Sequence, residues 1–252
     1  MNEALAILQL ENARLQRELR QARAELEDFT YAVSHDLRAS LRHVSAYVQI
    51  IREDLDEQNS TGVAAHLDTV SQAARQMGRQ IDGLMELARL TRVELQTSAL
   101  DLGALVREVC AGLAPALAGR TLVWQIASDF PALQGDATLV RQLMTHLLDN
   151  AVKFTAPRAQ ALVKVSWQLQ GEALCALTVS DNGVGFNPHY KDKLFHAFQR
   201  LHGARDFDGQ GMGLALSRKI VERHGGAVFA QGVPNEGCSV SCTLPLARLA
   251  GA

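Results

Sequence analysis

The sequence lacks three features that would assign a protein to a class at first sight. No run of apolar residues approaches the ~20 needed to cross a bilayer, and Glu3, Glu11 and Arg14 interrupt the N-terminal segment where a signal peptide needs a continuous apolar region. Neither sign of charge dominates, since 25 Lys and Arg residues stand against 27 Asp and Glu residues. We therefore expect a soluble chain without a membrane segment, and the composition does not support nucleic-acid binding.

Cysteine is scarce, and its spacing is not that of a metal site. The four cysteines form no CxxC pair, and Cys238 and Cys242 lie in an alternating, strand-like run. This usage favours buried thiols in a reducing cytoplasm over a metal site or a disulfide. Hydrophobic residues are plentiful, at 47% of 252 residues, which suits a packed core and a length of about two domains.

Apolar residues in the first ninety positions repeat at alternating steps of three and four, the spacing of a coiled coil. The first stripe includes a polar Asn12, which in a parallel two-stranded coiled coil sets the register, and it ends at the polar segment 56–62. A second stripe begins at Leu67, so the sequence predicts an antiparallel helical hairpin with a turn at 56–62, and two copies would form a four-helix bundle. The alternative is one amphipathic helix lying on its own domain.

From about Leu95 the pattern changes to mixed α/β. Helices are predicted over 136–155 and 214–226, a short strand and then a helix over 100–117, and strands over 121–127, 161–170, 173–181 and 237–246. Glycine becomes dense in the last third, where loops must adopt unusual dihedral angles or approach a ligand closely.

Two glycine-bearing segments lie at the ends of these predicted elements. The first, DNGVGF at 181–186, directly follows a strand, and the second, GQGMGLA at 209–215, opens a helix, whose first N–H groups can bind phosphate. Neither segment fits the phosphate loop or the dinucleotide fingerprint. Upstream, Asn150 and Lys153 are three residues apart on one predicted helix, which puts an oxygen ligand and a cation on the same face. That pair suits Mg²⁺ and a polyphosphate.

His35 lies beside the apolar stripe rather than on it, so we expect its imidazole to be accessible. Asp36 follows immediately and can hold the proton of one ring nitrogen, which makes the other nitrogen a better nucleophile. Arg38 can help to neutralise an incoming phosphate. The remaining histidines show no metal-ligand spacing.

In order and spacing, these motifs resemble the sequence boxes of bacterial sensor histidine kinases. SHDLRASL is similar to their phospho-accepting box, LLDNAVKFT to their Asn box, KLFHAFQRLH to their Phe-rich segment, and DNGVGF and GQGMGLA to their two glycine boxes. The resemblance covers about residues 27–246, and the sequences of its motifs are most similar to those of kinases of the phytochrome-like, multi-sensor type. Nothing before residue 27 resembles a sensor domain, so a sensor would lie outside this chain.

The resemblance implies an α plus α/β architecture in three parts. We expect a coiled-coil signalling helix at 1–28, a dimerisation and histidine phosphotransfer hairpin at 29–94, and an α/β sandwich ATP-binding domain of the gyrase, Hsp90 and histidine kinase type at 95–252. It further implies a cytoplasmic homodimer that phosphorylates His35 from ATP with Mg²⁺ and passes the phosphoryl group to an aspartate on a response-regulator receiver domain.

The resemblance also implies roles for the residues of the ATP-binding domain. Asp181 would read the adenine amino group, and Asn150 would hold Mg²⁺. Lys153 and Arg200 would face the phosphates, and Phe154 would pack near the nucleotide. Residues from about 187 to 208 would form a lid. The glycines that would shape the pocket are Gly183, Gly185, Gly209, Gly211 and Gly213.

Two residues depart from the family pattern. His146 stands where the family often has the first Asn of its Asn box, and Ser40 replaces the usual proline of the phospho-accepting box.

Two other functions stay open. The first alternative is an ATPase or chaperone-like module that uses the same fold without phosphotransfer. The second is a phosphatase-dominant or degenerate kinase core that acts as a receiver-binding scaffold.

Overall fold

The computed structural model describes residues 11–12, 15–16, 37, 39, 41–55, 63–117, 119–203 and 206–247. Contacts divide the chain into two compact units, Met1–Gln80 and Ile81–Ala252. The predicted residues His35, Asp36 and Arg38, and most of the predicted coiled coil, lie outside the described residues. In the described ranges, no helix combines the length and the apolar character that spanning a membrane requires.

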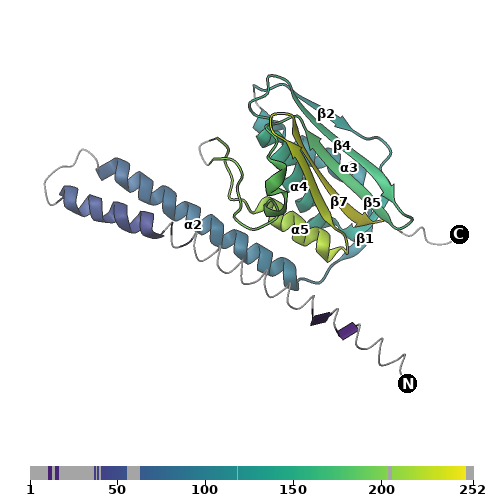
Figure 1. Ribbon diagram of the computed structural model, residues 1–252, viewed down its shortest axis with the longest axis horizontal. Helices are drawn as coiled ribbons and strands as arrows, with labels where there is room; N and C mark the ends of the chain where they lie inside the picture. The colour runs from purple at the N-terminus through teal and green to yellow at the C-terminus, as the bar shows by residue number, and fades with distance from the viewer. Residues whose placement is uncertain are drawn as a thin grey trace. The chain divides into compact units, whose positions relative to one another are not determined.

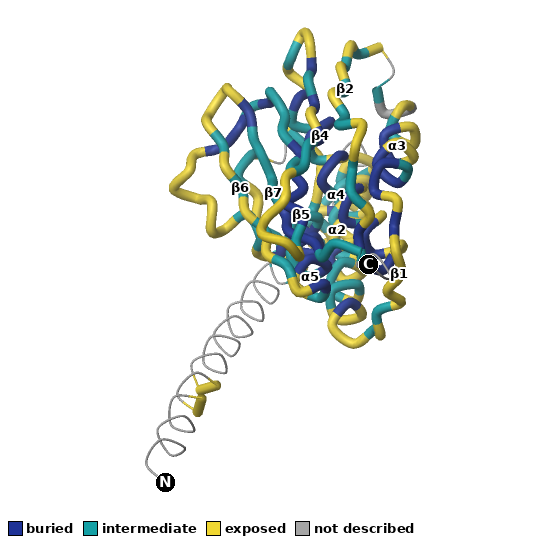
Figure 2. Tube along the Cα trace, turned by 90° about the vertical axis from the view of Figure 1, so that its right-hand side faces the viewer, coloured by how far each residue is buried: buried dark blue, intermediate teal, exposed yellow. Residues whose placement is uncertain are grey.

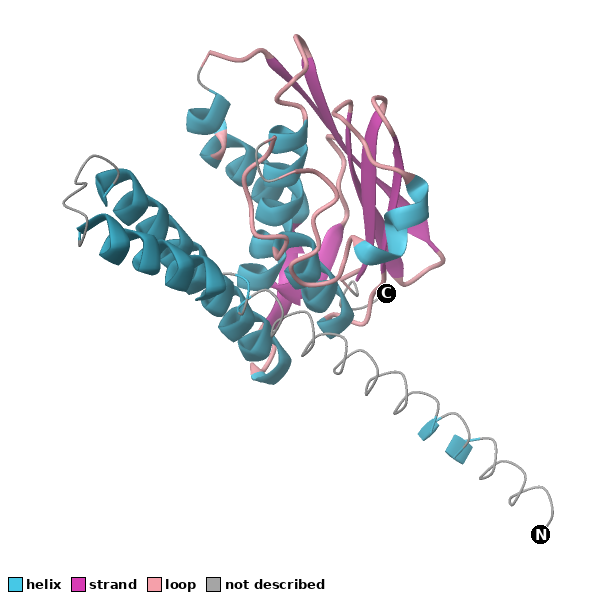
Figure 3. Ribbon diagram, turned by 60° about the vertical axis from the view of Figure 1, so that its left-hand side comes forward, coloured by secondary structure: helices cyan, strands magenta, loops and turns pink. Residues whose placement is uncertain are grey.

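The first unit contains two helical segments that lie side by side (Figures 1 and 3). One is residues 41–55, and the other is the first part of α2, Val63–Arg92. His66 on α2 places its Nε2 3.6 Å from Asp54 Oδ2, and its ring centroid lies 5.6 Å from that of Tyr47. These contacts confirm the two arms of the predicted hairpin, while its turn at 56–62 falls outside the described residues.

The second unit is an α/β sandwich in which helices cover one face of a five-stranded sheet (Figures 1 and 3). The strand order is β2-β4-β5-β7-β6, with β2 and β4 parallel and the other pairs antiparallel. A separate antiparallel pair joins β1 and β3. The elements are β1 Thr97–Asp101, α3 Leu102–Gly112, η1 Ala114–Leu117, β2 Leu122–Ile126, β3 Ala132–Asp136, α4 Ala137–Phe154, β4 Ala161–Gln170, β5 Leu174–Asp181, η2 Pro188–Lys193, α5 Gly213–Arg223, β6 Val228–Val233 and β7 Gly237–Pro245.

Helix α4 forms the centre of the core because its apolar residues recur on one face. Its buried positions face the sheet and the neighbouring helices, and Figure 2 shows that burial concentrates between these layers. On the sheet side, Val163, Val165, Leu177 and Val179 alternate with more exposed residues along β4 and β5. The buried residues of α4 are Leu139, Val140, Leu143, Met144, Leu147, Leu148, Ala151 and Val152.

The last turns of α2 belong by contact to the second unit. Arg223 on α5 donates hydrogen bonds to the carbonyls of Leu90 at 2.7 Å and Thr91 at 2.8 Å, and also bonds the carbonyl of Val93. Leu90 is fully buried. The boundary between the two units, at Gln80 and Ile81, therefore lies within α2 and before the predicted domain limit at 94/95. It lies there because the end of α2 packs on α5 and so belongs to the second unit.

The predicted helices and strands of this unit are confirmed, but β3 and β6 were not anticipated. Strand β3, ALQGD, has no β-branched or aromatic residue to mark it, and β6 is an edge strand interrupted by Gly232. The expectation of buried thiols is confirmed for Cys110, Cys175 and Cys242. Cys238 differs because it is only half-buried.

The first turn of α4 depends on the carboxylate of Asp136. Its Oδ1 accepts hydrogen bonds from the N–H groups of Thr138 at 3.0 Å and Leu139 at 3.2 Å, and its Oδ2 accepts one from Gln96 at 3.0 Å. Burial would raise the pKa of Asp136, but these N–H bonds outweigh it and hold the pKa below its usual value. The backbone N–H of Asp136 itself donates to His224 Nε2 at 3.0 Å.

Replacing this cap should destabilise the domain measurably. We expect Asp136→Ala to lower the free energy of unfolding by about 2 kcal/mol, since three N–H groups lose their acceptor. Asp101→Ala is the matched control, because Asp101 caps α3 through one bond to Ala104 at 2.8 Å, and it should cost roughly 1 kcal/mol or less. Urea denaturation measures both, and equal losses would contradict the role given to Asp136.

The same contact sets a pH dependence with a definite sign. Because the pKa of Asp136 is lower in the folded state than in the unfolded chain, its contribution is complete above the unfolded pKa and is lost as pH falls through the folded pKa. Asp136→Ala should therefore flatten the acid side of the stability curve.

Candidate functional site

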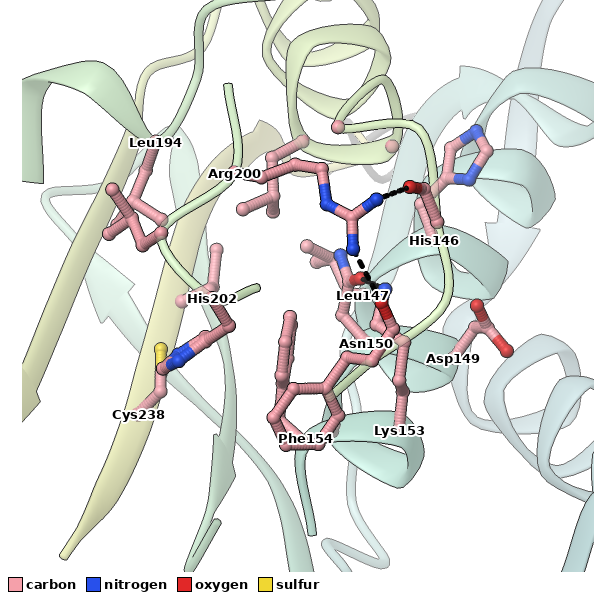
Figure 4. Close-up of a pocket in the computed structure, with 18 of the residues that line it drawn as sticks. His146, Leu147, Asp149, Asn150, Lys153, Phe154, Leu194, Arg200, His202 and Cys238 are labelled. Carbon is pink, nitrogen blue, oxygen red and sulfur yellow. Dashed lines mark hydrogen bonds between the residues drawn. The ribbon is translucent and has the colours of Figure 1, made fainter. Parts of the chain in front are cut away.

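A cavity of about 370 Å³ lies between α4, the ends of β5 and β7, the start of α5 and the segment that connects η2 to α5 (Figure 4). Its size falls within the range of small-molecule sites. The structure brings together nearly all of the residues that the sequence predicted for it. Those that line it are Asn150, Lys153, Phe154, Asp181, Gly185, Arg200, Gly209, Gly211 and Gly213. Gly183 is buried and is not one of the lining residues.

Asp181 provides a carboxylate at one end of the cavity. It is the last residue of β5, and it pairs with Val163 on β4 and with Cys238 on β7. Burial raises its pKa from 3.8 to about 6, against the opposing effects of the Gly183 and Cys238 N–H groups and the charge of Arg158. The Gly183 N–H lies 2.8 Å from Oδ1. A partly buried carboxylate of this kind is suited to accept a hydrogen bond from a ligand amino group.

The C-terminal part of α4 carries the polar groups at the other end. Lys153 Nζ donates to Asn150 Oδ1 at 2.9 Å, so the amide oxygen already faces a cation. Burial lowers the pKa of Lys153, the negative charge of Asp149 opposes this, and the positive charge of Arg200 adds to it. Two cations that face one partly desolvated space favour an anionic ligand.

The start of α5 adds backbone groups to this end. Its N-cap residue, Met212, makes no side-chain capping bond, so the first turn offers N–H groups that a phosphate can accept. Gly213 leaves this point open: a Cβ there would lie 3.6 Å from His146 Nδ1 and 3.7 Å from Asn150 Nδ2. A longer side chain at position 213 would therefore compete with a ligand for the space beside Asn150.

The segment predicted as a lid folds around Arg200. The guanidinium donates hydrogen bonds to the carbonyls of Gly209 at 2.7 Å, Phe207 at 2.5 Å and Gly203 at 3.3 Å. In Figure 4 the Arg200 side chain extends into the cavity toward Asn150. Arg200 therefore organises the lid backbone as well as presenting positive charge to the cavity.

Aromatic rings close the cavity on the lid side. The ring of Phe154 lies 5.4 Å from that of His202 and 5.0 Å from that of Phe207, and Lys153 Nζ lies 4.7 Å from the Phe154 centroid. His202 Nε2 bonds the Gly185 carbonyl at 2.9 Å, and because a carbonyl only accepts, this nitrogen carries the proton. The lid is thus joined both to α4 and to the first glycine segment.

Sequence reasoning missed four residues at or beside this site. His202 belongs to the Phe-rich segment KLFHAFQRLH, and Phe207 belongs to the predicted lid, so a motif marked the position of each but gave it no role. Cys238 and Arg158 had none, because a strand cysteine and a loop arginine are common. His146, noted as a departure from the family, lines the cavity, and its buried Nε2 has no hydrogen-bond partner in the described part of the chain.

The chain matches two family models. Residues 25–92 match the His Kinase A (phospho-acceptor) domain, and residues 135–248 match the histidine kinase-, DNA gyrase B- and HSP90-like ATPase. Together they account for the helical region and most of the α/β sandwich, so the predicted type of each is confirmed.

Curated relatives agree with these matches. The methanogenesis regulatory histidine kinase FilI of Methanothrix harundinacea is 32% identical over 88% of this chain and 25% of its own length, and the phytochrome-like protein Cph1 of Synechocystis sp. is 29% identical over 94% and 31%. The adaptive-response sensory kinase SasA of Synechococcus sp. is 31% identical over 100% of this chain and 66% of its own. The chain thus spans about a quarter to a third of the first two relatives.

Solved structures show the same fold. ShkA in complex with AMPPNP has a TM-score of 0.60 at 24% identity, over 75% of this chain and 39% of that one. ThkA in complex with the response regulator TrrA has a TM-score of 0.66 at 17% identity, over 90% of this chain and 64% of that one.

The raised pKa of Asp181 predicts how stability without ligand depends on pH. The folded state holds this proton more tightly than the unfolded chain, so the free energy of unfolding should fall as pH rises from about 4 to about 6 and stay level above that. Asp181→Asn removes the buried charge and should stabilise the unliganded domain at pH 8 by on the order of 2 kcal/mol. Urea denaturation at pH 5 and pH 8 measures this, and a variant no more stable than wild type at pH 8 would contradict it.

Proposed function

This chain belongs to the two-component sensor histidine kinases and contains their catalytic core, and we propose that it phosphorylates its own His35 from ATP with Mg²⁺ and passes the phosphoryl group to a response-regulator receiver domain. The observation that carries the proposal is the cavity itself, in which Asp181, Asn150 and Lys153 converge with both glycine segments. Their order from carboxylate to cations matches a ligand with a basic heterocycle at one end and phosphates at the other.

Asn150 and its neighbours are suited to a magnesium nucleotide. The Asn150 amide oxygen already accepts a hydrogen bond from a cation, Lys153 Nζ, so it is oriented to act as an oxygen ligand for positive charge. Mg²⁺ usually takes one or two protein oxygens and completes its shell with water and substrate phosphates. Bound there, Mg²⁺ would supply neutralisation of phosphate charge. Lys153 and Arg200 would bind the phosphate oxygens, and Asp181 would accept the adenine amino proton.

The reaction is an in-line transfer to an imidazole. A ring nitrogen of His35 forms the N–P bond while the P–O bond to ADP breaks, and ADP leaves with the electron pair. Asp36 would hold the other ring nitrogen's proton, and Arg38 would neutralise charge on the arriving phosphoryl group. A receiver aspartate then attacks phosphorus and the N–P bond breaks. Positioning and charge neutralisation supply most of the catalysis.

Two kinds of partner belong to the proposal, a second copy of this chain and a receiver domain. Leu41, Leu55 and Leu67 are 57%, 58% and 51% exposed, which supports a homodimer that buries them in a four-helix bundle. The fold match to ThkA, whose structure includes the response regulator TrrA, supports a receiver domain as the phosphoryl acceptor. A cytoplasmic location, a sensor domain outside this chain and the three-part division at 28/29 and 94/95 belong to the same proposal.

Two observations favour this function over an ATPase or a scaffold. The phospho-acceptor match covers residues 25–92, which include His35, and an ATPase without phosphotransfer has no use for that region. The groups expected to bind nucleotide are present and converge on one cavity, which a degenerate scaffold would not need.

Replacing the phospho-accepting histidine should abolish labelling without removing nucleotide binding. We expect His35→Gln to give no acid-labile label from γ-labelled ATP while its ATP affinity stays within a few-fold of wild type, because His35 lies outside the ATP-binding domain. His43→Gln is the matched control, because it removes an exposed histidine eight residues further along the chain, and it should label normally. Acid-labile label that persists on His35→Gln would show that another residue is the nucleophile.

Replacing Asn150 should separate metal-dependent from metal-independent binding. We expect calorimetry to show that Mg²⁺ strengthens ATP binding to wild type but no longer does so in Asn150→Ala, with similar affinities in EDTA, because the lost group is a metal ligand rather than a core residue. Thr145→Ala is the control on the same helix, since Thr145 is exposed and its hydroxyl donates to the Arg141 carbonyl of its own helix at 2.9 Å. A full Mg²⁺ effect in Asn150→Ala would refute the assignment.

A further inference from the structure

One arginine that is not among the cavity-lining residues connects three segments: its own turn after α4, the first glycine segment and the turn between β6 and β7. Arg158 lies in the turn between α4 and β4, and its Nε donates to the carbonyl of Asn182 at 2.7 Å. Its Nη2 donates to the carbonyls of Gly183 at 2.8 Å and Asn235 at 2.5 Å. A single planar guanidinium thus joins the first glycine segment, 181–186, to the turn between β6 and β7.

The first glycine segment has little freedom apart from these bonds. Val184 donates to the Phe154 carbonyl at 3.2 Å, and its own carbonyl accepts from the Asn235 N–H at 2.7 Å. A Cβ at Gly185, whose φ is +60°, would lie 1.9 Å from the carbonyl oxygen of Val233. The segment is therefore held between the end of α4 and the β6–β7 turn, and Arg158, which follows α4, bonds both the segment and that turn.

Gly183 is the residue through which Arg158 reaches the site. Its carbonyl accepts from Arg158, and its N–H donates to Asp181 Oδ1 at 2.8 Å. A Cβ at Gly183 would lie 2.5 Å from the Phe154 carbonyl oxygen, so only glycine fits at this close approach to the end of α4. Building on the nucleotide binding proposed above, we propose that Arg158 is a positioning residue that fixes Gly183 so that the Asp181 carboxylate is aimed at the base.

The positive charge of Arg158 has a second effect, on the pKa of Asp181, which can be tested separately from its hydrogen bonds. Burial raises the pKa of Asp181, and the positive charge of Arg158 opposes that rise. The other titratable groups at this point are the Cys238 thiol on β7, whose pKa burial raises to about 12, and His202 in the lid, which bonds the carbonyl of Gly185. The Cys238 thiol is neutral at ordinary pH, so Arg158 is the nearby cation that favours the ionised carboxylate.

Two variants separate the geometry from the charge. Calorimetry on the full chain would measure adenosine and ATP affinities between pH 5 and pH 8. At pH 8, Arg158→Gln should weaken adenosine and ATP binding by the same factor, roughly ten-fold for lost charge-assisted hydrogen bonds. Its binding midpoint should move to higher pH, because Asp181 loses a favourable cation. Arg158→Lys should keep the wild-type midpoint near pH 6 but lose most of the affinity, since an ammonium cannot bond three carbonyls as the guanidinium fork does.

Amide hydrogen exchange without nucleotide tests the geometry directly. In Arg158→Gln, the amides of residues 182–185 should exchange at least ten-fold faster while those in the middle of α4 keep their protection. Arg107→Gln, which removes an exposed arginine from α3, is the control and should match wild type in both measurements.

The outcomes are distinct. Wild-type adenosine affinity with an unshifted midpoint in Arg158→Gln, loss of ATP binding without loss of adenosine binding, or faster exchange across the whole domain would each overturn the inference. If wild type binds neither adenosine nor ATP, the proposed function fails, and the exchange measurement still decides whether Arg158 holds the glycine segment.

Discussion

Helix α4 carries the constraint on which the rest of the structure depends, because its two faces must satisfy opposite requirements. One face buries eight residues in the core, while Asn150, Lys153 and Phe154 near its end face the cavity. Both ends are held: Asp136 caps the first turn, and Arg120 bonds the Val152 carbonyl at 3.2 Å near the last. A shift of one residue along the helix would move these polar groups by about 100° around its axis.

Backbone proximity is the second constraint, and it explains the glycines around the cavity. A Cβ at Gly185 would lie 1.9 Å from the Val233 carbonyl oxygen at the end of β6, and a Cβ at Gly211 would lie 2.6 Å from the Gln199 carbonyl oxygen in the lid. Both residues also have a positive φ. The first glycine segment and the loop before α5 can therefore pack against these carbonyls only without side chains at these points. The lid residues His202 and Phe207 in turn pack against Phe154 at the end of α4.

Charge is distributed along the cavity in a way that suits one orientation of a nucleotide. Asp181 stands at one end, with a pKa of about 6, and Lys153 and Arg200 stand toward the other. Asp181 and Arg200 are held by backbone groups of different segments, and Lys153 by the Asn150 amide oxygen on the same helix, so the polarity of the cavity is a property of the fold. Partial burial keeps the charges of Asp181 and Lys153 effective, because water screens them less than it would at the surface.

The sequence by itself determined the elements and the residues that recur with a period or stand in a motif. Helix α4, the paired strands β4 and β5, the spacing of Asn150 and Lys153, and the glycine segments were predictable because each depends on neighbours a few residues away. Only the tertiary structure decided the roles of Arg158, His202 and Cys238. Arg158 bonds carbonyls 24, 25 and 77 positions away, and His202 bonds one 17 positions away. Every residue has a carbonyl, so no side-chain pattern marks the partner, and it is identified only once the chain has folded.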